Sequence, residues 1–174
     1  MDGQILLWIQ DSVRVEALDS FVLGLTTLNN HGYLAIATCL LMLILPKVRR
    51  VGLAATVSLL INVLVVNVTI KPLVGRIRPY EVVEGLRLLG EVQEDFSFPS
   101  GHSAAAFAVA VVMYKFLPKR VGVPALVLAA AIALSRLYIG VHYPTDVLVG
   151  ALIGAACAWF SCTIFKRFVT GKTK

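Results

Sequence analysis

The sequence has little charge and none of the short motifs by which many soluble enzymes are recognised. Charged residues make up 15% of its 174 residues, against about 25% in a typical soluble domain. It contains no HExxH, no DxD and no carboxylate cluster, so we expect no metal ion and no other cofactor. It also lacks a GxSxG turn and a P-loop, which argues against α/β-hydrolase-type serine hydrolases and P-loop nucleoside triphosphatases.

Cysteine is also scarce, and the three cysteines show no functional spacing. Cys39, Cys157 and Cys162 lie inside apolar runs, without a CxxC or Cys/His pattern. We interpret them as small buried or lipid-facing residues. The net charge of +6 is not arranged as a basic stripe with interleaved aromatic residues, so we expect no nucleic acid as a partner.

Hydrophobic residues, 58% of the chain, are instead gathered into long runs. A membrane-spanning helix needs about 20 mostly apolar residues. The runs that reach or approach this length are 32–45, 51–70, 103–117, 122–141 and 147–165. The first and third are short and need flanking residues to span. The sequence therefore predicts an all-α fold, a polytopic membrane helical bundle with about five transmembrane helices.

Upstream of these runs, residues 1–30 have the pattern of amphipathic helices. Apolar residues such as Trp8 and Phe21 recur at helical spacing, with charged residues between them. This pattern predicts helices that lie in the membrane interface, with Trp8 as an anchor; a kinked sixth span is the alternative. We therefore divide the chain into an N-terminal interfacial segment (1–30), a transmembrane domain (31–166) and a basic tail (167–174).

Lysine and arginine mark one side of the predicted bundle. Ten of the sixteen basic residues follow the first, third and fifth runs, and no Asp or Glu lies among them. They are Lys47, Arg49, Arg50, Lys115, Lys119, Arg120, Lys166, Arg167, Lys172 and Lys174. By the positive-inside rule these ends, including the C-terminus, are cytoplasmic. The 71–100 connection and the turn at His142 are then outside.

Three short polar segments interrupt the apolar sequence, where charge is costly. They are 71–79 (KPLVGRIRP), 99–102 (PSGH) and 135–146 (SRLYIGVHYPTD). All three segments fall on the predicted outer side, which is assigned from the ten basic residues and not from the segments themselves. Together they hold two histidines, four cations, a carboxylate and a glycine-containing turn. These are the groups needed to move a phosphoryl group through a histidine.

The two histidines have neighbours that suit this chemistry. Asp146 follows His142 by four residues and can orient its ring in a compact turn; the alternative is an acid that faces a helix dipole. His102 follows Ser100, which can cap a helix, and Gly101, whose backbone can approach an anion. His102 can then donate a proton to a leaving oxygen. The alternative is a capping Ser-Gly pair beside an incidental histidine.

Four basic side chains in these segments can hold the equatorial oxygens of a phosphoryl group. They are Lys71, Arg76, Arg78 and Arg136. The alternative for each is a side chain that extends to the lipid headgroups, and this fits Arg76 best. The remaining histidine, His31, receives no role.

In order and spacing, K-x6-R-P, P-S-G-H and S-R-x5-H-x3-D resemble the three motifs of the type-2 phosphatidic acid phosphatase family. The resemblance spans residues 32–165 and implies metal-independent dephosphorylation by a helical bundle. It implies that His142 is the nucleophile that forms a phosphohistidine, that Asp146 orients it and that His102 is the acid for the leaving group. The phosphate-binding residues that it implies are Lys71, Arg78, Ser100, Gly101 and Arg136. Arg76 is not a motif position.

The compact form resembles bacterial members of this family, which implies an integral plasma-membrane protein with its site on the extracytoplasmic face. The expected partners are membrane lipids and a lipid phosphate or diphosphate. Undecaprenyl diphosphate is the first choice, with phosphatidylglycerophosphate or phosphatidic acid as the alternative; no pattern indicates an oligomeric state. We expect the acidic stretch 80–99 to shape access. Vanadium haloperoxidases, which are soluble, share the motifs, and a channel or lipid transporter is the non-enzymatic alternative.

Overall fold

The computed structural model describes residues 1–171, and all regular structure in that part of the chain is helical. The α-helices are α1 (Asp2–Ser12), α2 (Glu16–Thr27), α3 (Tyr33–Ile44), α4 (Arg49–Val63), α5 (Lys71–Val74), α6 (Pro79–Val82), α7 (Gly101–Phe116), α8 (Lys119–Tyr138) and α9 (Pro144–Thr170). A 3-10 turn, η1 (Asn30–Gly32), precedes α3, and a π-helical stretch, η2 (Leu64–Ile70), joins α4 to α5. The predicted all-α class is confirmed.

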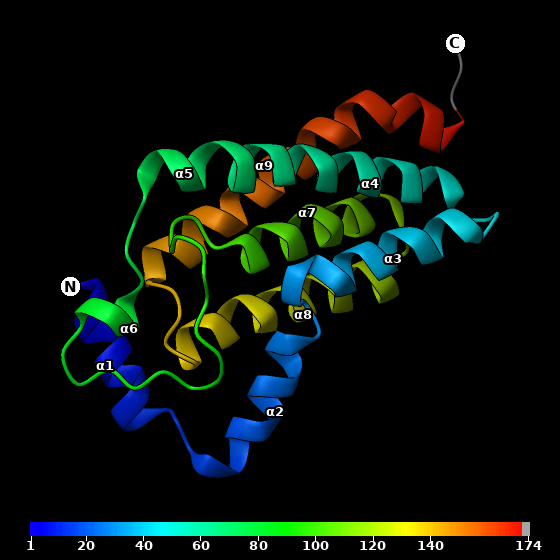
Figure 1. Cartoon of the computed structure of the whole chain (residues 1–174). Coiled ribbons are helices and arrows are strands. Elements are labelled where there is room, and N and C mark those ends of the chain that lie inside the picture. Colours follow the sequence, from blue (N-terminus) through cyan, green and yellow to red (C-terminus); the bar gives the residue numbers. More distant parts are fainter. Residues whose placement is uncertain (172–174) are drawn as a thin grey trace.

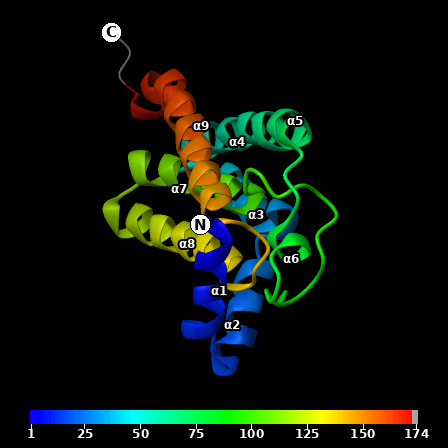
Figure 2. The same ribbon diagram turned by 90° about the vertical axis from the view of Figure 1, so that its left-hand side faces the viewer.

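The longer helices form a bundle around α7. Figure 1 shows α3, α4, α7, α8 and α9 running roughly along one direction, with α1 and α2 beneath one end; Figure 2 views the bundle from that end. Helix α7 packs against α4, α8 and α9, and its buried face is alanine, valine and one serine. Such small side chains let helices approach closely in a membrane. Cys39, Cys157 and Cys162 are buried and unpaired, as predicted.

Two glycines of α9 make its approach to α7 especially close. A Cβ atom at Gly150 would lie 2.5 Å from the Ser100 carbonyl oxygen, and one at Gly154 would collide with the Ala104 carbonyl oxygen. The two helices can pack this way only with glycine at both positions. The backbone N–H of Ser100 also donates to the Asp146 carbonyl oxygen at 3.0 Å, which ties the starts of the two helices together.

Three helical stretches are long and apolar enough to cross a membrane: Arg49–Val82, Lys119–Tyr138 and Pro144–Thr170. Helix α2 and the η1–α3 helix, bent by 40° relative to each other, would together make a fourth, and α7 is apolar but has 16 residues. The bend coincides with His31 and Gly32, whose φ angles are 51° and 76°. The membrane bundle is confirmed, while the number of five spans, like the sixth-span alternative, stays a prediction.

The N-terminal segment is helical, as its periodicity predicts, and lies beneath one end of the bundle (Figure 1). Leu6 of α1 is buried against Leu86 and Tyr143. Trp8 of α1 and Phe21 of α2, in contrast, are 60% and 69% exposed. Exposed aromatic and apolar side chains of this kind suit a helix in the membrane interface, which stays a prediction.

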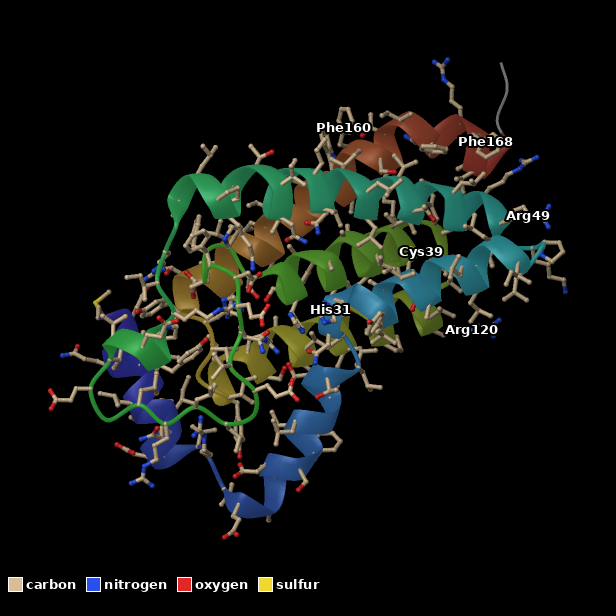
Figure 3. All side chains as sticks on the ribbon, viewed as in Figure 1. His31, Cys39, Arg49, Arg120, Phe160 and Phe168 are labelled. Atoms are coloured by element: carbon tan, nitrogen blue, oxygen red, sulfur yellow. The ribbon has the colours of Figure 1, made fainter. Side chains whose placement is uncertain are left out.

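The two ends of the bundle differ in charge. Arg49 and Arg120 lie at the end away from α1, where α4 and α8 begin (Figure 3). Helix α9 continues through Arg167 to Thr170, so this part of the predicted basic tail is helical. Residues 172–174 of that tail lie outside the described residues. The three polar segments lie at the opposite end, near α1 (Figure 1).

Gly154→Ala is expected to lower the free energy of unfolding by about 1–3 kcal/mol, because the added Cβ would force α7 and α9 apart. Gly24→Ala is the matched control: Gly24 is helical and exposed, and a Cβ there would meet nothing within 4 Å. It should be neutral or slightly stabilising. Thermal unfolding in detergent measures both variants. A Tm for Gly154→Ala equal to that of the parent would contradict the close contact.

Candidate active site

The three polar segments meet at one end of the bundle (Figure 1). The first follows η2 into α5, the second leads into α7, and the third covers the end of α8 and the turn into α9. They border a cavity of about 680 Å³, whose lining includes five of the predicted site residues: Lys71, Arg78, Gly101, His102 and His142. The other three, Ser100, Arg136 and Asp146, are buried.

His142 lies in the turn between α8 and α9 and is 1% exposed. Its Nδ1 is 3.5 Å from Asp146 Oδ2 and 3.4 Å from Ser97 Oγ. Its Nε2 is 3.5 Å from a guanidinium nitrogen of Arg78. One ring nitrogen therefore faces a carboxylate and the other a cation, an arrangement typical of a nucleophile with an orienting acid. Such contacts are often long before substrate binds.

Burial holds the pKa of His142 far below its ordinary value of 6.5, at about 3. The interior disfavours the charged imidazolium, and this is the main cause. The hydrogen bond to Asp146 acts in the other direction, while the charges of Arg78, Arg136 and Lys71 lower the pKa again. His142 is therefore neutral at pH 7, and a neutral imidazole has the lone pair that nucleophilic attack requires.

Asp146 is fully buried in the first turn of α9, and its two oxygens have several partners. Oδ2 accepts from the Ser97 hydroxyl at 2.5 Å and from the backbone N–H of Tyr143 at 3.0 Å. Oδ1 accepts from the Arg76 guanidinium at 2.6 Å. The two alternatives for Asp146 are therefore both met: it caps the first turn of α9, and it also lies against the ring of His142.

Arg76 is a residue whose place sequence reasoning missed. Besides Asp146, it pairs with Asp2 Oδ2 at 3.1 Å and donates to Thr145 Oγ1 at 2.7 Å. Its guanidinium carbon also lies 3.8 Å from the centre of the Tyr143 ring. The sequence left the role of Arg76 open, with a headgroup contact as one alternative, and these contacts direct its guanidinium instead toward α1 and α9. Its position inside segment 71–79 is the one sequence signal that marks it.

Two asparagines hold His102, the second residue of α7. Asn30 Oδ1 is 3.0 Å from Nε2 of the ring, and Asn29 Nδ2 donates to the His102 backbone carbonyl at 3.2 Å. An amide oxygen can only accept, so we assign the ring proton to Nε2. Burial, followed by the charge of Arg136 and other nearby groups, lowers the pKa of His102 to about 2, so the ring is neutral in the free protein. The negative charge of a bound phosphate would favour the protonated ring that a proton donor needs. No motif marks either asparagine in the sequence.

Ser100 and Gly101 form the start of α7. The Ser100 hydroxyl oxygen accepts from the backbone N–H and the hydroxyl of Ser103 at 3.4 and 3.0 Å, as expected of a capping residue. A Cβ at Gly101 would lie 3.4 Å from Asn67 Oδ1 and 4.0 Å from Lys71 Cε. The first turn of α7 thus borders the cavity beside a cation, and such a helix N-terminus suits an anion.

Three of the predicted cations are buried and do not extend to headgroups. Lys71, Arg78 and Arg136 are 6%, 2% and 1% exposed. Lys71 and Arg78 both pair with the carboxylate of Asp95, which sequence reasoning missed. Arg136 donates to Thr26 Oγ1 at 2.6 Å, and its Nε has no hydrogen-bond partner within the described part of the chain. Buried cations in this number suit an anionic ligand.

The acidic stretch between α6 and α7 borders the same cavity. Its lining includes Glu91, Val92, Gln93, Glu94 and Asp95. The stretch is irregular and is held in place by Ser97, whose N–H donates to the Arg76 carbonyl at 2.8 Å. This position agrees with the expectation that the stretch shapes access to the site.

Within residues 1–171, no three His, Cys, Asp or Glu side chains are grouped so that they could hold a metal ion. Besides the three carboxylates of the acidic stretch, the ionisable groups that line the cavity are the histidines His31, His102 and His142 and the cations Lys71 and Arg78. Guanidinium and ammonium groups bind phosphate oxygens directly. The arrangement can bind a phosphoryl group, attack it and protonate its leaving oxygen.

The sequence is similar to known phosphatases. A family model described as the PAP2 superfamily matches residues 51–169, which contain all three polar segments. The chain is 31% identical over 132 residues to an undecaprenyl-diphosphatase of Sulfolobus acidocaldarius, with 76% of this chain and 64% of the relative covered. It spans less than two thirds of the length of this and the next two curated relatives that it matches.

Two solved structures are similar over most of their length. LpxE of Aquifex aeolicus has a TM-score of 0.76 and 29% identity, with 92% of this chain and 93% of that chain covered. A transmembrane PAP2-type phosphatidylglycerolphosphate phosphatase from Bacillus subtilis also has a TM-score of 0.76, with 27% identity and coverage of 95% and 85%. The helical bundle of this chain is the fold of these two proteins.

His142 is expected to stay neutral from roughly pH 8 to pH 5, because its pKa is about 3 in the folded protein. The NMR resonances of its ring should not shift over this range; they are assigned by their loss in His142→Gln. The unfolded chain takes up a proton near pH 6.5, so stability should decline as pH falls below that value. A His142 ring that titrates near pH 6.5 would contradict its burial.

Proposed function

The chain belongs to the PAP2 superfamily, and on that premise we propose that it is a membrane lipid phosphatase that acts through a phosphohistidine. The resemblance found in its three motifs is confirmed at the level of the family. The observation that carries the proposal is the position of His142. Its Nδ1 faces Asp146, and its Nε2 lies 3.5 Å from Arg78 at the cavity.

In the first step, Nε2 of His142 attacks phosphorus while cations at the cavity hold the phosphoryl oxygens. Bound substrate phosphate brings negative charge that favours a protonated His102, which carries a proton on both ring nitrogens. The bond from phosphorus to the bridging oxygen breaks, and this imidazolium donates its Nε2 proton to that oxygen and becomes neutral. The nitrogen–phosphorus bond leaves His142 with positive charge. Asp146 lies against Nδ1 and stabilises this charge, which is the role of an orienting acid.

In the second step, a water molecule attacks the phosphohistidine. His102, now neutral, accepts a proton from that water, and the bond between nitrogen and phosphorus breaks. Inorganic phosphate leaves, and His142 and His102 return to their starting protonation states. In this scheme the charge that a metal ion supplies in other phosphatases comes from Lys71, Arg78, Arg136 and the first turn of α7.

We propose two lipids as the leading substrates. Undecaprenyl diphosphate is supported by the Sulfolobus relative that is named for it. Phosphatidylglycerophosphate is supported by the similar Bacillus phosphatase structure, and phosphatidic acid has the same terminal phosphate. All three carry a phosphate at the end of a lipid, which suits a cavity at one end of a membrane bundle.

We propose that the site faces the outside of the plasma membrane and that the C-terminus is cytoplasmic. The support is the separation of charge along the bundle. Arg49 and Arg120 lie at the end away from α1 (Figure 3), whereas the acidic stretch borders the cavity at the other end. Basic ends of membrane bundles are retained in the cytoplasm.

His142→Ala is expected to lower phosphate release by about 10⁴-fold or more, because the proposed scheme then lacks its nucleophile. The measurement is inorganic phosphate released by the purified protein from the three lipids in mixed micelles, compared by kcat/KM. The matched control is His31→Asn: His31 borders the same cavity but is exposed and has no role in the scheme, and asparagine tolerates its positive φ angle of 51°. Turnover by His142→Ala near that of the parent would refute the mechanism.

The same assay with EDTA tests the metal-free scheme. Activity should persist, because the positive charge at the site belongs to the protein. Loss of activity that Mg²⁺ restores would refute the metal-free scheme.

A channel or lipid transporter would release phosphate from none of the lipids. Acid-labile, alkali-stable labelling by a ³²P-lipid, absent in His142→Ala, would identify the phosphohistidine directly.

Of two reporters fused after Lys174, only the one that is active in the cytoplasm is expected to give a signal, because the basic residues keep that end of the bundle in the cytoplasm. The measurement pairs a reporter that needs the cytoplasm with one that needs the outside. An outside location of the C-terminus would overturn the proposed orientation and would place the site in the cytoplasm.

A further inference from the structure

Asp95 occupies the two cations that would bind phosphate. One of its carboxylate oxygens pairs with Lys71 Nζ and the other with an Arg78 guanidinium nitrogen. The Arg78 Nε also donates to the Asp95 backbone carbonyl at 2.8 Å. A carboxylate with each oxygen on a different cation presents the same charge pattern as two oxygens of a phosphate.

The cations and the carboxylate differ in how firmly they are held. The side chains of Lys71 and Arg78 are 8% and 2% exposed, whereas that of Asp95 is 58% exposed. Lys71 is the first residue of α5, and Arg78, which immediately precedes α6, also donates to the Val141 carbonyl at 2.9 Å. Asp95 comes from the irregular stretch between α6 and α7 at the cavity. It can therefore leave while the cations stay.

The charge of Asp95 persists at neutral pH. Partial burial alone would raise its pKa, but the hydrogen bonds and charges of Lys71 and Arg78 outweigh this and hold the pKa below its usual value. Two buried cations without an anion would repel each other and lose solvation. The free site therefore needs an anion, and a bound phosphate would replace the one that Asp95 supplies.

We propose that Asp95 is an internal competitor of phosphate, which neutralises the site when it is free and displaces inorganic phosphate after hydrolysis. This inference rests on the proposed phosphatase function. Substrate phosphate, with about two negative charges and three terminal oxygens, replaces the single charge of the carboxylate. After hydrolysis the carboxylate returns to Lys71 and Arg78 and the product leaves. Asp95 thus weakens the binding of phosphate, and the product is released more readily as a result.

Competition by Asp95 predicts opposite effects of its removal on phosphate affinity and on stability. Asp95→Asn removes the competing charge, so inorganic phosphate should bind about 10-fold more tightly. Without phosphate, the same variant should unfold at a lower temperature, because Lys71 and Arg78 lose their anion. Phosphate should then raise the Tm of the variant more than that of the parent. A residue that only supports the fold would weaken both stability and phosphate binding.

The experiment measures the Kd of inorganic phosphate by calorimetry, and its inhibition constant against lipid hydrolysis, with the full chain in neutral detergent. Glu84→Gln is the matched control, because Glu84 is an exposed carboxylate of the same stretch that does not line the cavity or pair with either cation; the Kd of this variant should change less than about 2-fold. Unchanged or weaker phosphate binding by Asp95→Asn, with the parent binding normally, would overturn this inference alone. A parent that binds no phosphate would overturn the proposed site and this inference with it.

Discussion

The site depends on one fully buried carboxylate. Asp146 lies in the first turn of α9 with no exposure, and a charge in that position is tolerated only when several donors satisfy it. Its donors come from separate parts of the chain: the Arg76 guanidinium, the Ser97 hydroxyl and the backbone N–H of Tyr143. The need to satisfy one acid therefore brings three connections together around His142.

Helix packing makes that burial achievable. Gly150 and Gly154 let α9 approach the backbone of α7, and the Ser100 N–H then reaches the Asp146 carbonyl. The start of α7 carries His102, so the same contact determines where the second histidine lies. Close packing of small residues, which supplies stability in a membrane, also sets the distance between the two histidines.

Much of the fold follows from sequence, and the exceptions have physical causes. The apolar runs 51–70, 122–141 and 147–165 correspond to α4 with η2, α8 and α9, because continuous hydropathy is a local property. The run 32–45 corresponds only to α3, which is bent away from α2 at His31 and Gly32. Hydropathy shows how long an apolar stretch is, but it does not show whether a backbone with positive φ angles bends within it.

By itself the sequence determined the membrane class, the helical fold and the motif residues that gather at one end of the bundle, because hydropathy and spacing are short-range properties. Only the tertiary structure decided which groups those residues meet. Arg76 reaches Asp146 across 70 positions, and Asn30 reaches His102 across 72. Asp95 pairs with Lys71 and Arg78 from an irregular stretch that has no motif. A buried charge or ring nitrogen is satisfied by whichever polar group the fold brings near, and no local pattern records that choice.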